Sequence, residues 1–370
     1  MKYFHEFHDP VLCGRWAGRL AARPNRPWML MEVCGGQTHA IIRHGLDQLL
    51  PPSVELIHGP GCPVCVTPPG LIDAALELAA RPGVTLCSFG DMVRVPGGAG
   101  DLLSRRAEGA DVRIVTAPHE ALRLAGQLPD REIVLFAIGF ETTAPVTAAS
   151  LLQARRAGLT NFSILSAHVT IVPAVEAIAA SPECRLNGLL APGHVCAVTG
   201  SRLFEPFVER HRIPVVVTGF EPADILAGFD GCLAQLEEGR AEVVNAYPRA
   251  VRREGNPTAL DLMERVFERA DRAWRGLGTI PASGLALREA FTEFDATRRF
   301  RLEPASTPPP SPCISDRVLT GRARPTDCPA FGRECTPERP LGATMVSGEG
   351  ACAAYYKFRR SHDRGSPAHA

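Results

Sequence analysis

Short apolar runs alternate with helix-like segments along most of the chain, from about residue 28 to residue 240. The apolar runs predict strands at Trp28–Val33, Val54–Ile57, Val84–Ser88, Val112–Val115, Ile133–Ile138, Phe162–Ser166, Gly188–Leu190 and Val215–Thr218. The intervening segments predict helices that include Leu71–Ala80, Pro118–Leu124, Thr147–Arg156, Val172–Ala179 and Ala223–Gly228. This alternation is typical of α/β units on a mostly parallel sheet.

A weak internal repeat divides this region into two parts. When the chain is shifted against itself by 132 residues, Met29–Cys34 aligns with Asn161–Ser166, and Pro60–Cys62 aligns with Pro192–His194. We therefore expect two related parallel-sheet α/β domains, residues 28–126 and 127–240, that face a shared cleft.

The remaining residues, 1–27 and 241–370, have a different character and predict a third domain, partly helical and partly irregular. Leu260–Leu277 predicts one helix, because its apolar positions fall on one face. Pro304–Pro312 predicts a linker, and the last ten residues, from Ser361, are expected to be disordered. The segment between them is rich in Cys, Gly and Pro, so something other than a hydrophobic core is expected to order it.

Composition and charge narrow the possible functions. Forty basic residues balance forty acidic ones, which gives no reason to expect binding to nucleic acid or to an anionic membrane. No signal peptide and no apolar run long enough to span a bilayer is recognised, so a cytoplasmic protein is expected. Lys2 and Lys357 are the only lysines, which excludes a Walker A loop and a Schiff-base lysine in the middle of the chain.

Four of the twelve cysteines lie in the irregular C-terminal region, at Cys313, Cys328, Cys335 and Cys352. Four thiols are the ligand set of a [4Fe-4S] cluster and also of a structural zinc ion. Zinc sites usually use close C-x2–4-C pairs, whereas the spacing here is C-x14-C-x6-C-x16-C. The wide spacing favours a cluster, flanked by aromatic side chains, and leaves zinc or disulfides as alternatives.

Two further cysteine motifs follow predicted strands. The sequence G-P-G-C-P-V-C places Cys62 and Cys65 in a C-x-x-C arrangement between a strand and a helix, which is typical of a redox dithiol. Cys34 follows the first strand, and Gly35 and Gly36 after it permit close approach of a ligand or partner. Because ligands of open α/β sheets bind at these strand ends, all three thiols are expected in one crevice. The alternative is a set of packed, inert cysteines.

Polar candidates follow other strands. Glu141 and Thr142 stand in G-F-E-T-T-A-P, where they can cap the next helix or point into the crevice. His168 and His194 are each either an orienting group or an ordinary loop histidine. The other five cysteines are interpreted as buried or incidental thiols: Cys13, Cys87, Cys184, Cys196 and Cys232.

Together these motifs resemble the HypD family of hydrogenase maturation factors. The resemblance is carried by M-E-V-C-G-G-Q-T-H-A-I (31–41), which includes His39, by G-P-G-C-P-V-C-V-T-P (59–68) and by G-F-E-T-T-A-P (139–145). The tail adds C-P-A-F-G-R-E-C-T-P (328–337) and M-V-S-G-E-G-A-C-A-A-Y-Y (345–356). The sequence departs from the family at Gln37, where many members have His, and at Thr344, where relatives often carry a cysteine.

The resemblance implies a scaffold that, with the small chaperone HypC, assembles the Fe(CN)2CO unit of [NiFe]-hydrogenases. It also implies that cyanide arrives from HypE, which is loaded by HypF. Iron is implied at Cys34, a redox dithiol at Cys62 and Cys65, and a [4Fe-4S] cluster on the four tail cysteines. The fold implied is two α/β domains and a cluster domain. The residues alone leave a second function open, that of an iron–sulfur-dependent thiol/disulfide reductase acting on another substrate, so it stays uncertain whether the protein is an enzyme.

Overall fold

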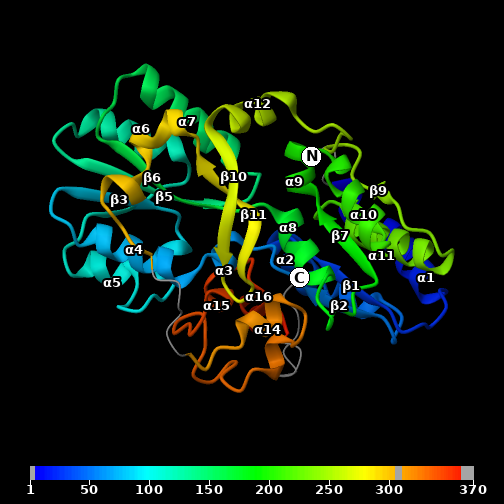
Figure 1. The fold of residues 1–370 in the computed structure, drawn as a ribbon. Coiled ribbons are helices and arrows are strands. Elements are labelled where there is room, and N and C mark those ends of the chain that lie inside the picture. The colour runs from blue at the N-terminus through cyan, green and yellow to red at the C-terminus, as the bar shows by residue number, and fades with distance from the viewer. Residues whose placement is uncertain (1–4, 305–310, 360–370) are drawn as a thin grey trace.

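The computed structural model of the chain describes residues 5–304 and 311–359 and contains two parallel sheets. Sheet A has the strand order β2-β1-β7-β8-β9 and consists of β1 (Met29–Glu32), β2 (Glu55–His58), β7 (Gly188–Pro192), β8 (Val215–Thr218) and β9 (Val243–Asn245). Sheet B has the order β4-β3-β5-β6 and consists of β3 (Val84–Ser88), β4 (Val112–Ile114), β5 (Glu132–Gly139) and β6 (Phe162–His168). Figure 1 shows sheet B on the left and sheet A on the right.

Helices flank both sheets, as expected for strands that are buried on both faces. Those that accompany sheet A are α1 (Pro10–Ala21), α2 (Gly35–His44), α9 (Gly193–Thr199), α10 (Glu205–His211) and α11 (Pro222–Glu237). Those that accompany sheet B are α4 (Pro69–Ala79), α5 (Leu102–Ala107), α6 (Pro118–Gln127), α7 (Ala144–Arg156) and α12 (Pro257–Val266). Helices α3 (Pro63–Val66) and α8 (Ile171–Ala179) lie on the two crossings between the sheets.

The last part of the chain supplies a hairpin and a compact tail. The antiparallel strands β10 (Phe267–Trp274) and β11 (Gly278–Leu287) run between the two sheets in Figure 1 and are followed by α13 (Ala296–Arg299). The tail carries three short helices, α14 (Ser315–Leu319), α15 (Ala343–Val346) and α16 (Ala351–Phe358), of which α16 packs on α2. The tail therefore lies against the end of sheet A.

The strand predictions agree closely with the structure, but the sheets do not follow the predicted division at residue 127. The chain forms β1 and β2 in sheet A, crosses to build all of sheet B, and returns to sheet A at β7. A local hydrophobic pattern identifies a strand but carries no information on which strand it pairs with. The 132-residue shift accordingly aligns β1 of sheet A with β6 of sheet B, and β2 with β7, both of sheet A.

The predicted helix Leu260–Leu277 is wrong in its second half. Helix α12 ends at Val266, and the chain continues directly into β10. Asn256 caps α12 by accepting hydrogen bonds from the N–H groups of Thr258 and Ala259. The predicted linker, Pro304–Pro312, falls largely on residues 305–310, and these and the tail end from Ser361 lie outside the described residues.

One continuous hydrophobic core joins the two sheets. It contains Met31 of β1 and Phe136 of β5 together with Cys65 of α3 and Trp274 of the hairpin. Helix α3 and the hairpin therefore pack into the place where the sheets meet.

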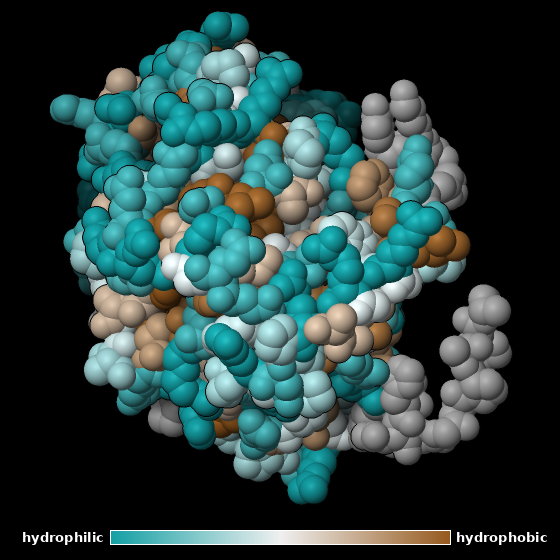
Figure 2. All heavy atoms as spheres, turned by 90° about the vertical axis from the view of Figure 1, so that its right-hand side faces the viewer, coloured by the Kyte–Doolittle hydropathy of each residue, from teal (hydrophilic) through white to brown (hydrophobic). Residues whose placement is uncertain are grey.

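The outside of the molecule is mainly hydrophilic on the side that carries α1, α10 and α11, where apolar side chains appear only in small groups (Figure 2). Within the described ranges, no helix combines the length and the apolar character needed to cross a membrane.

Candidate functional site at the carboxyl edge of sheet A

Cys34 and the Cys62–Cys65 loop lie side by side at the carboxyl edge of sheet A. Strands β1 and β2 are parallel neighbours, so the residues that follow them emerge together. The N–H of Gly35 donates to the carbonyl of Gly61 over 3.1 Å, which ties the two turns together. A side chain at Gly61 would collide with the backbone of Val33 and Cys34, so this approach requires glycine.

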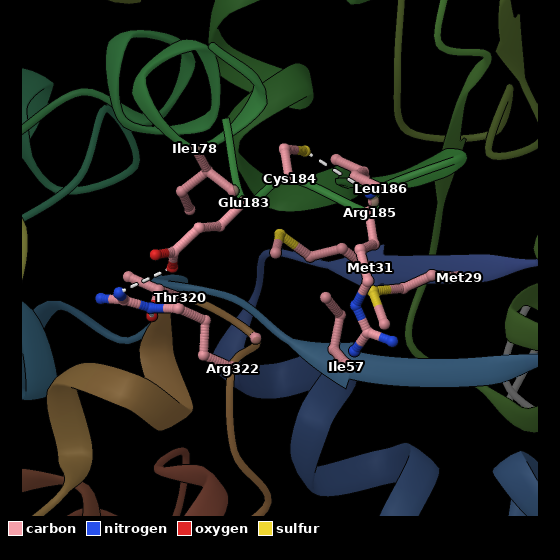
Figure 3. A pocket seen from close by; sticks show the side chains of 11 residues that line it. Met29, Met31, Ile57, Ile178, Glu183, Cys184, Arg185, Leu186, Thr320 and Arg322 are labelled. Carbon is pink, nitrogen blue, oxygen red and sulfur yellow. Dashed lines mark hydrogen bonds and ion pairs between the residues drawn. The ribbon is translucent and has the colours of Figure 1, made fainter. Parts of the chain in front are cut away.

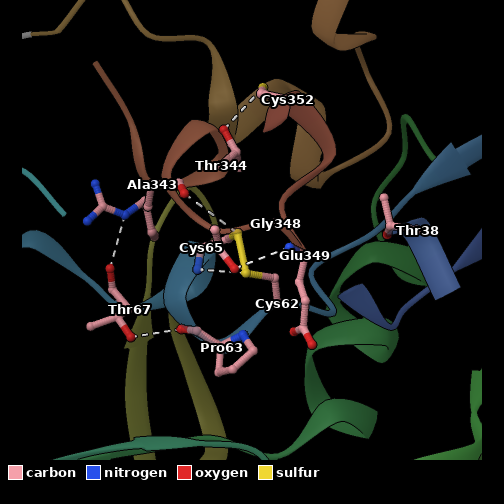
Figure 4. Close-up of a disulfide and its surroundings, with 12 residues drawn as sticks. Thr38, Cys62, Pro63, Cys65, Thr67, Ala343, Thr344, Gly348, Glu349 and Cys352 are labelled. Atoms are coloured by element: carbon pink, nitrogen blue, oxygen red, sulfur yellow. Dashed lines mark hydrogen bonds between the residues drawn. A yellow bond between two sulfur atoms is a disulfide. The ribbon is translucent and has the colours of Figure 1, made fainter. Parts of the chain in front are cut away.

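Cys62 and Cys65 are buried and joined by a disulfide bond (Figure 4). Cys62 precedes the short helix α3, and its Sγ accepts a hydrogen bond of 3.2 Å from the N–H of Cys65. Pro63 starts α3 where a missing N–H costs nothing. The C-x-x-C spacing thus places the two sulfurs in bonding contact, as the motif predicted.

A buried carboxylate, Glu32, stands directly behind Cys34. It is 0% exposed, and its Oε2 accepts the N–H of Cys34 over 2.8 Å. Its Oε1 is hydrogen-bonded to the Thr38 hydroxyl and, over 2.7 Å, to Nδ1 of His58. This network fixes the turn that carries the thiol. Sequence reasoning missed it, although a glutamate inside the apolar strand M-L-M-E-V was a visible signal.

The Cys34 thiol is half-buried at the start of α2. Burial raises its pKa to about 12; the N–H groups of Gln37 and Gly36 oppose this, and the nearby carboxylates of Glu32 and Glu349 add to it. The residue is therefore a neutral thiol at physiological pH. A metal ion that binds it must displace the proton, so metal affinity rises with pH.

The chain itself fills the space beside the two glycines. Glu349 of the tail packs against Gly35, and the Phe220 ring would lie 3.2 Å from a Cβ at Gly36. His39 bonds through Nδ1 to the Gly348 carbonyl over 3.0 Å. The close approach expected at Gly35 and Gly36 thus comes from the tail and from Phe220.

Two more residues line this edge. His194, at the start of α9, is stacked on Phe220 with ring centroids 3.7 Å apart, and burial lowers its pKa. Gln37 donates from Nε2 to the carbonyls of Ala191 and Thr218, at 3.2 and 3.1 Å. Gln37 thus attaches the start of α2 to the ends of β7 and β8 by an amide, without any titratable group.

Glu141 occupies the equivalent edge of sheet B, beside the half-buried Thr142. Its Oε1 accepts the N–H of Ile171, the first residue of α8, over 3.2 Å. Glu141 therefore caps α8, whereas the sequence had suggested that it caps α7. Burial raises the pKa of Glu141 to about 7, opposed by its backbone hydrogen bonds and by Arg269. Its Oε2 has no hydrogen-bond partner among the described residues.

Cys196, interpreted from sequence as incidental, comes shortly after β7 of sheet A. It lies on α9 and is fully buried. Burial raises its pKa, and Glu141 and Cys34 in their ionised forms would raise it further.

His168 is enclosed by sheet B and the hairpin. Its Nε2 lies 3.4 Å from the Thr147 hydroxyl and its Nδ1 lies 3.5 Å from the Ser166 hydroxyl. Its ring also contacts Phe267. Burial, with a contribution from Arg272, lowers its pKa to about 3. The imidazole is therefore neutral and is engaged inside the protein.

The four tail cysteines line one small cavity, together with Ile314, Ser315, Val318, Phe331, Gly342, Thr344 and Met345. The N–H of Leu341 donates to the Cys335 Sγ over 3.3 Å, and the Thr344 hydroxyl donates to the Cys352 Sγ over 3.2 Å. Burial raises the pKa of Cys352 to about 12, which the Thr344 hydrogen bond partly offsets.

The thiols of this cavity are a donor set that more than one metal group can use. In the described part of the chain no three His, Cys, Asp or Glu side chains are arranged to hold a single metal ion. Four thiols around one cavity, with N–H and O–H donors to sulfur, are the donor set of an iron–sulfur cluster and equally of a structural zinc ion. Of the predicted flanking aromatics, Phe331 lines the cavity and contacts Tyr356, whereas Tyr355 faces His58.

A separate pocket lies on the face of sheet A (Figure 3). It is lined by β1, β2, the end of α8 and the tail turn 320–322, and Arg322 forms an ion pair with Glu183 across its rim. Met29 and Met31 in its wall belong to the strand before the carboxyl edge. The pocket therefore contains none of the predicted site residues.

Comparison with known proteins identifies the family of this chain. The family model HypD, described as "Hydrogenase formation hypA family", matches residues 14–359. The chain is 52% identical over 369 residues to the hydrogenase expression/formation protein HupD of Azotobacter chroococcum mcd 1, with 97% of each chain covered. It is equally similar, over the same length and coverage, to the hydrogenase maturation factor HypD of Azotobacter vinelandii. The corresponding factor of Rhodobacter capsulatus is 45% identical over 370 residues, covering 97% of this chain and 98% of that protein. The chain belongs to the HypD family.

Proposed function

We propose that this chain is a hydrogenase maturation factor on which the Fe(CN)2CO unit of [NiFe]-hydrogenases is assembled, with the iron held by Cys34. The family membership and the names of the relatives support the hydrogenase assignment. The observation that carries the proposed site is the hydrogen-bonded turn that brings Cys34 beside the Cys62–Cys65 disulfide.

The iron chemistry suits a thiolate. Iron(II) that binds cyanide and carbon monoxide is electron-rich, and sulfur is a soft donor able to hold it. Cys34 gives up its proton on binding, and the Glu32 network holds the turn in place during this change. A HypC-type chaperone is proposed to contribute a second cysteine, and HypE, loaded by HypF, to deliver cyanide.

The disulfide is proposed as the redox group next to the iron. Two electrons and two protons convert it to two thiols, which then stand beside Cys34 as reductant or as further iron ligands. The four tail cysteines would hold a [4Fe-4S] cluster, which supplies one-electron transfer when it is bound.

Polar side chains at the carboxyl edges of both sheets are proposed to form hydrogen bonds with the cyanide ligands. Glu141 is suited to this because its raised pKa of about 7 leaves it partly protonated near neutral pH, and its Oε2 is free to donate. Thr142 and His194 are the other candidates. His168 is omitted because protein hydroxyls approach both of its ring nitrogens.

A second candidate function is an iron–sulfur-dependent thiol/disulfide reductase. The observation that favours it is the contact between the disulfide and the tail, where Cys65 Sγ lies 3.9 Å from the Ala343 carbonyl. It leaves the third thiol, Cys34, and its buried network without a purpose.

Infrared spectroscopy of the protein purified anaerobically with its HypC-type partner tests the proposal. Bands of iron-bound cyanide and carbon monoxide are expected. Their absence, together with turnover of a disulfide substrate, would favour the reductase. Iron and acid-labile sulfide of about four each per chain would identify the cluster. Zinc without sulfide would instead assign the four cysteines to a structural zinc site.

A further inference from the structure

One short tail segment separates the disulfide from the four-cysteine cavity. Cys65 Sγ lies 3.9 Å from the carbonyl of Ala343, and the next residue, Thr344, donates its hydroxyl to Cys352 Sγ. Figure 4 shows this segment, with the disulfide on one side and Cys352 on the other. Two adjacent residues of the tail therefore contact the two sulfur groups: Ala343 contacts the disulfide, and Thr344 contacts a thiol of the four-cysteine cavity.

Thr344 is held firmly in this position. It is 1% exposed, and Gly350 packs so closely on its carbonyl that a side chain at position 350 would collide with it. Within residues 311–359, Thr344 is the one residue whose side chain donates a hydrogen bond to a tail thiol. The hydrogen bonds to Cys335 come from backbone N–H groups. Its donor can therefore be removed without altering the backbone.

A hydrogen bond to a ligand sulfur has a defined electronic consequence. Reduction of a cluster adds one negative charge, which spreads onto the thiolate ligands. A donor at the sulfur stabilises that charge more in the reduced state than in the oxidised state, so it raises the reduction potential. The effect is larger where water is excluded, and Cys352 is only 8% exposed.

We propose that the hydroxyl of Thr344 sets the reduction potential of the cluster held by Cys313, Cys328, Cys335 and Cys352. This inference rests on the proposed cluster. Thr344 acts through Cys352 and is a positioning residue in this sense. It forms no hydrogen bond with the Cys62–Cys65 disulfide, so that couple should be independent of its side chain.

The test is a redox titration of the purified holoprotein, followed by the electron paramagnetic resonance signal of the reduced cluster. Thr344→Val keeps the shape and removes the donor, and Thr344→Ser keeps the donor. Thr344→Val should lower the equilibrium constant for cluster reduction by about tenfold, which is about 59 mV for one electron. Thr344→Ser should stay close to the wild type.

A matched control is Thr320→Val, at the residue that follows α14, because the Thr320 hydroxyl donates to the carbonyls of Asp316 and Arg317 and, among the described residues, to no sulfur. It should leave the cluster potential unchanged, and the midpoint of the disulfide should be the same in every variant.

The outcomes separate the inference from the proposal beneath it. A wild-type protein without iron and sulfide would remove the proposed cluster itself. A cluster of unchanged potential in Thr344→Val overturns the role of Thr344. If Thr344→Val does not hold the cluster, Thr344→Ala is measured instead, because it removes the donor with a smaller side chain. If Thr344→Ala also loses the cluster while Thr344→Ser keeps it, Thr344 is needed for cluster assembly and does not set the potential.

Discussion

The two sheets end in different chemistry although they share a parallel architecture. At the carboxyl edge of sheet A stand three thiols, supported by the buried Glu32 network and covered by the tail. At the carboxyl edge of sheet B stand Glu141 and His168, enclosed by α8 and by the β10–β11 hairpin. The parallel strands bring side chains to both edges, but the segment that covers each edge decides what those side chains can do.

The covers differ in kind. The hairpin buries His168 between Phe267 and Arg272 and keeps it neutral. The tail brings carbonyls, Glu349 and a second group of thiols to the edge of sheet A. The edge of sheet A thus carries thiols, the groups on which the proposed iron and redox chemistry depends, whereas the edge of sheet B carries buried polar groups of shifted pKa.

The largest effect that we expect is on folding stability, and it comes from Glu141 at the edge of sheet B. Its folded pKa of about 7 lies above its ordinary value of 4.5, so the folded state favours the protonated form. Stability is then lost as the pH rises from 4.5 through 7, by up to about 3 kcal/mol. Glu141→Gln keeps an acceptor for the Ile171 N–H and should remove this loss, so the variant should be more stable than the wild type at pH 8. Denaturant unfolding at pH 5 to 8 measures it.

Glu209→Gln, at an exposed site on α10, is the control and should follow the wild type. His168 acts in the opposite direction, because its pKa of about 3 lies below 6.5 and its contribution is lost as the pH falls below 6.5. Since His168 is common to all three proteins, they must be compared at each pH. Equal pH slopes in wild type and Glu141→Gln would mean that Glu141 is ionised throughout.

A smaller effect is expected at the edge of sheet A from Glu32→Gln. The amide cannot accept from Cys34, Thr38 and His58 together, so the thiol turn loses part of its support. Outer groups of this kind typically contribute 10–100-fold in metal affinity. Iron(II) affinity, measured anaerobically by competition with a chelator, should fall by about that factor, whereas Glu55→Gln on the neighbouring strand should not change it. Unchanged iron affinity in Glu32→Gln would mean that the Glu32 network does not support iron binding.

The strands were predictable because buried parallel strands consist of continuous apolar runs, such as Ile133–Ile138. Their division between sheets was not, because pairing depends on contacts between distant segments. The hairpin was misread because Phe267 and Trp274 fit a helical spacing as well as they fit the two ends of a strand. Only the partner strand β11 decides between the two.

The proximity of the three thiols was predictable because their motifs follow predicted strands. Cys34, Cys62 and Cys65 follow neighbouring strands, so the rule for parallel sheets places them together. Glu32 and His58 are 26 positions apart and meet only once β1 pairs with β2. The contact of Thr344 with Cys352 likewise depends on the fold of an irregular tail, for which no periodicity gives a guide.

The most direct test of the central claim, that Cys34 holds the assembled iron apart from the cluster, is the infrared spectrum of Cys34→Ala beside its iron and sulfide content. The protein is purified anaerobically with its HypC-type partner. The account predicts that the cyanide and carbon monoxide bands disappear while about four iron and four sulfide per chain remain. Persistent bands, or loss of the cluster together with them, would contradict it.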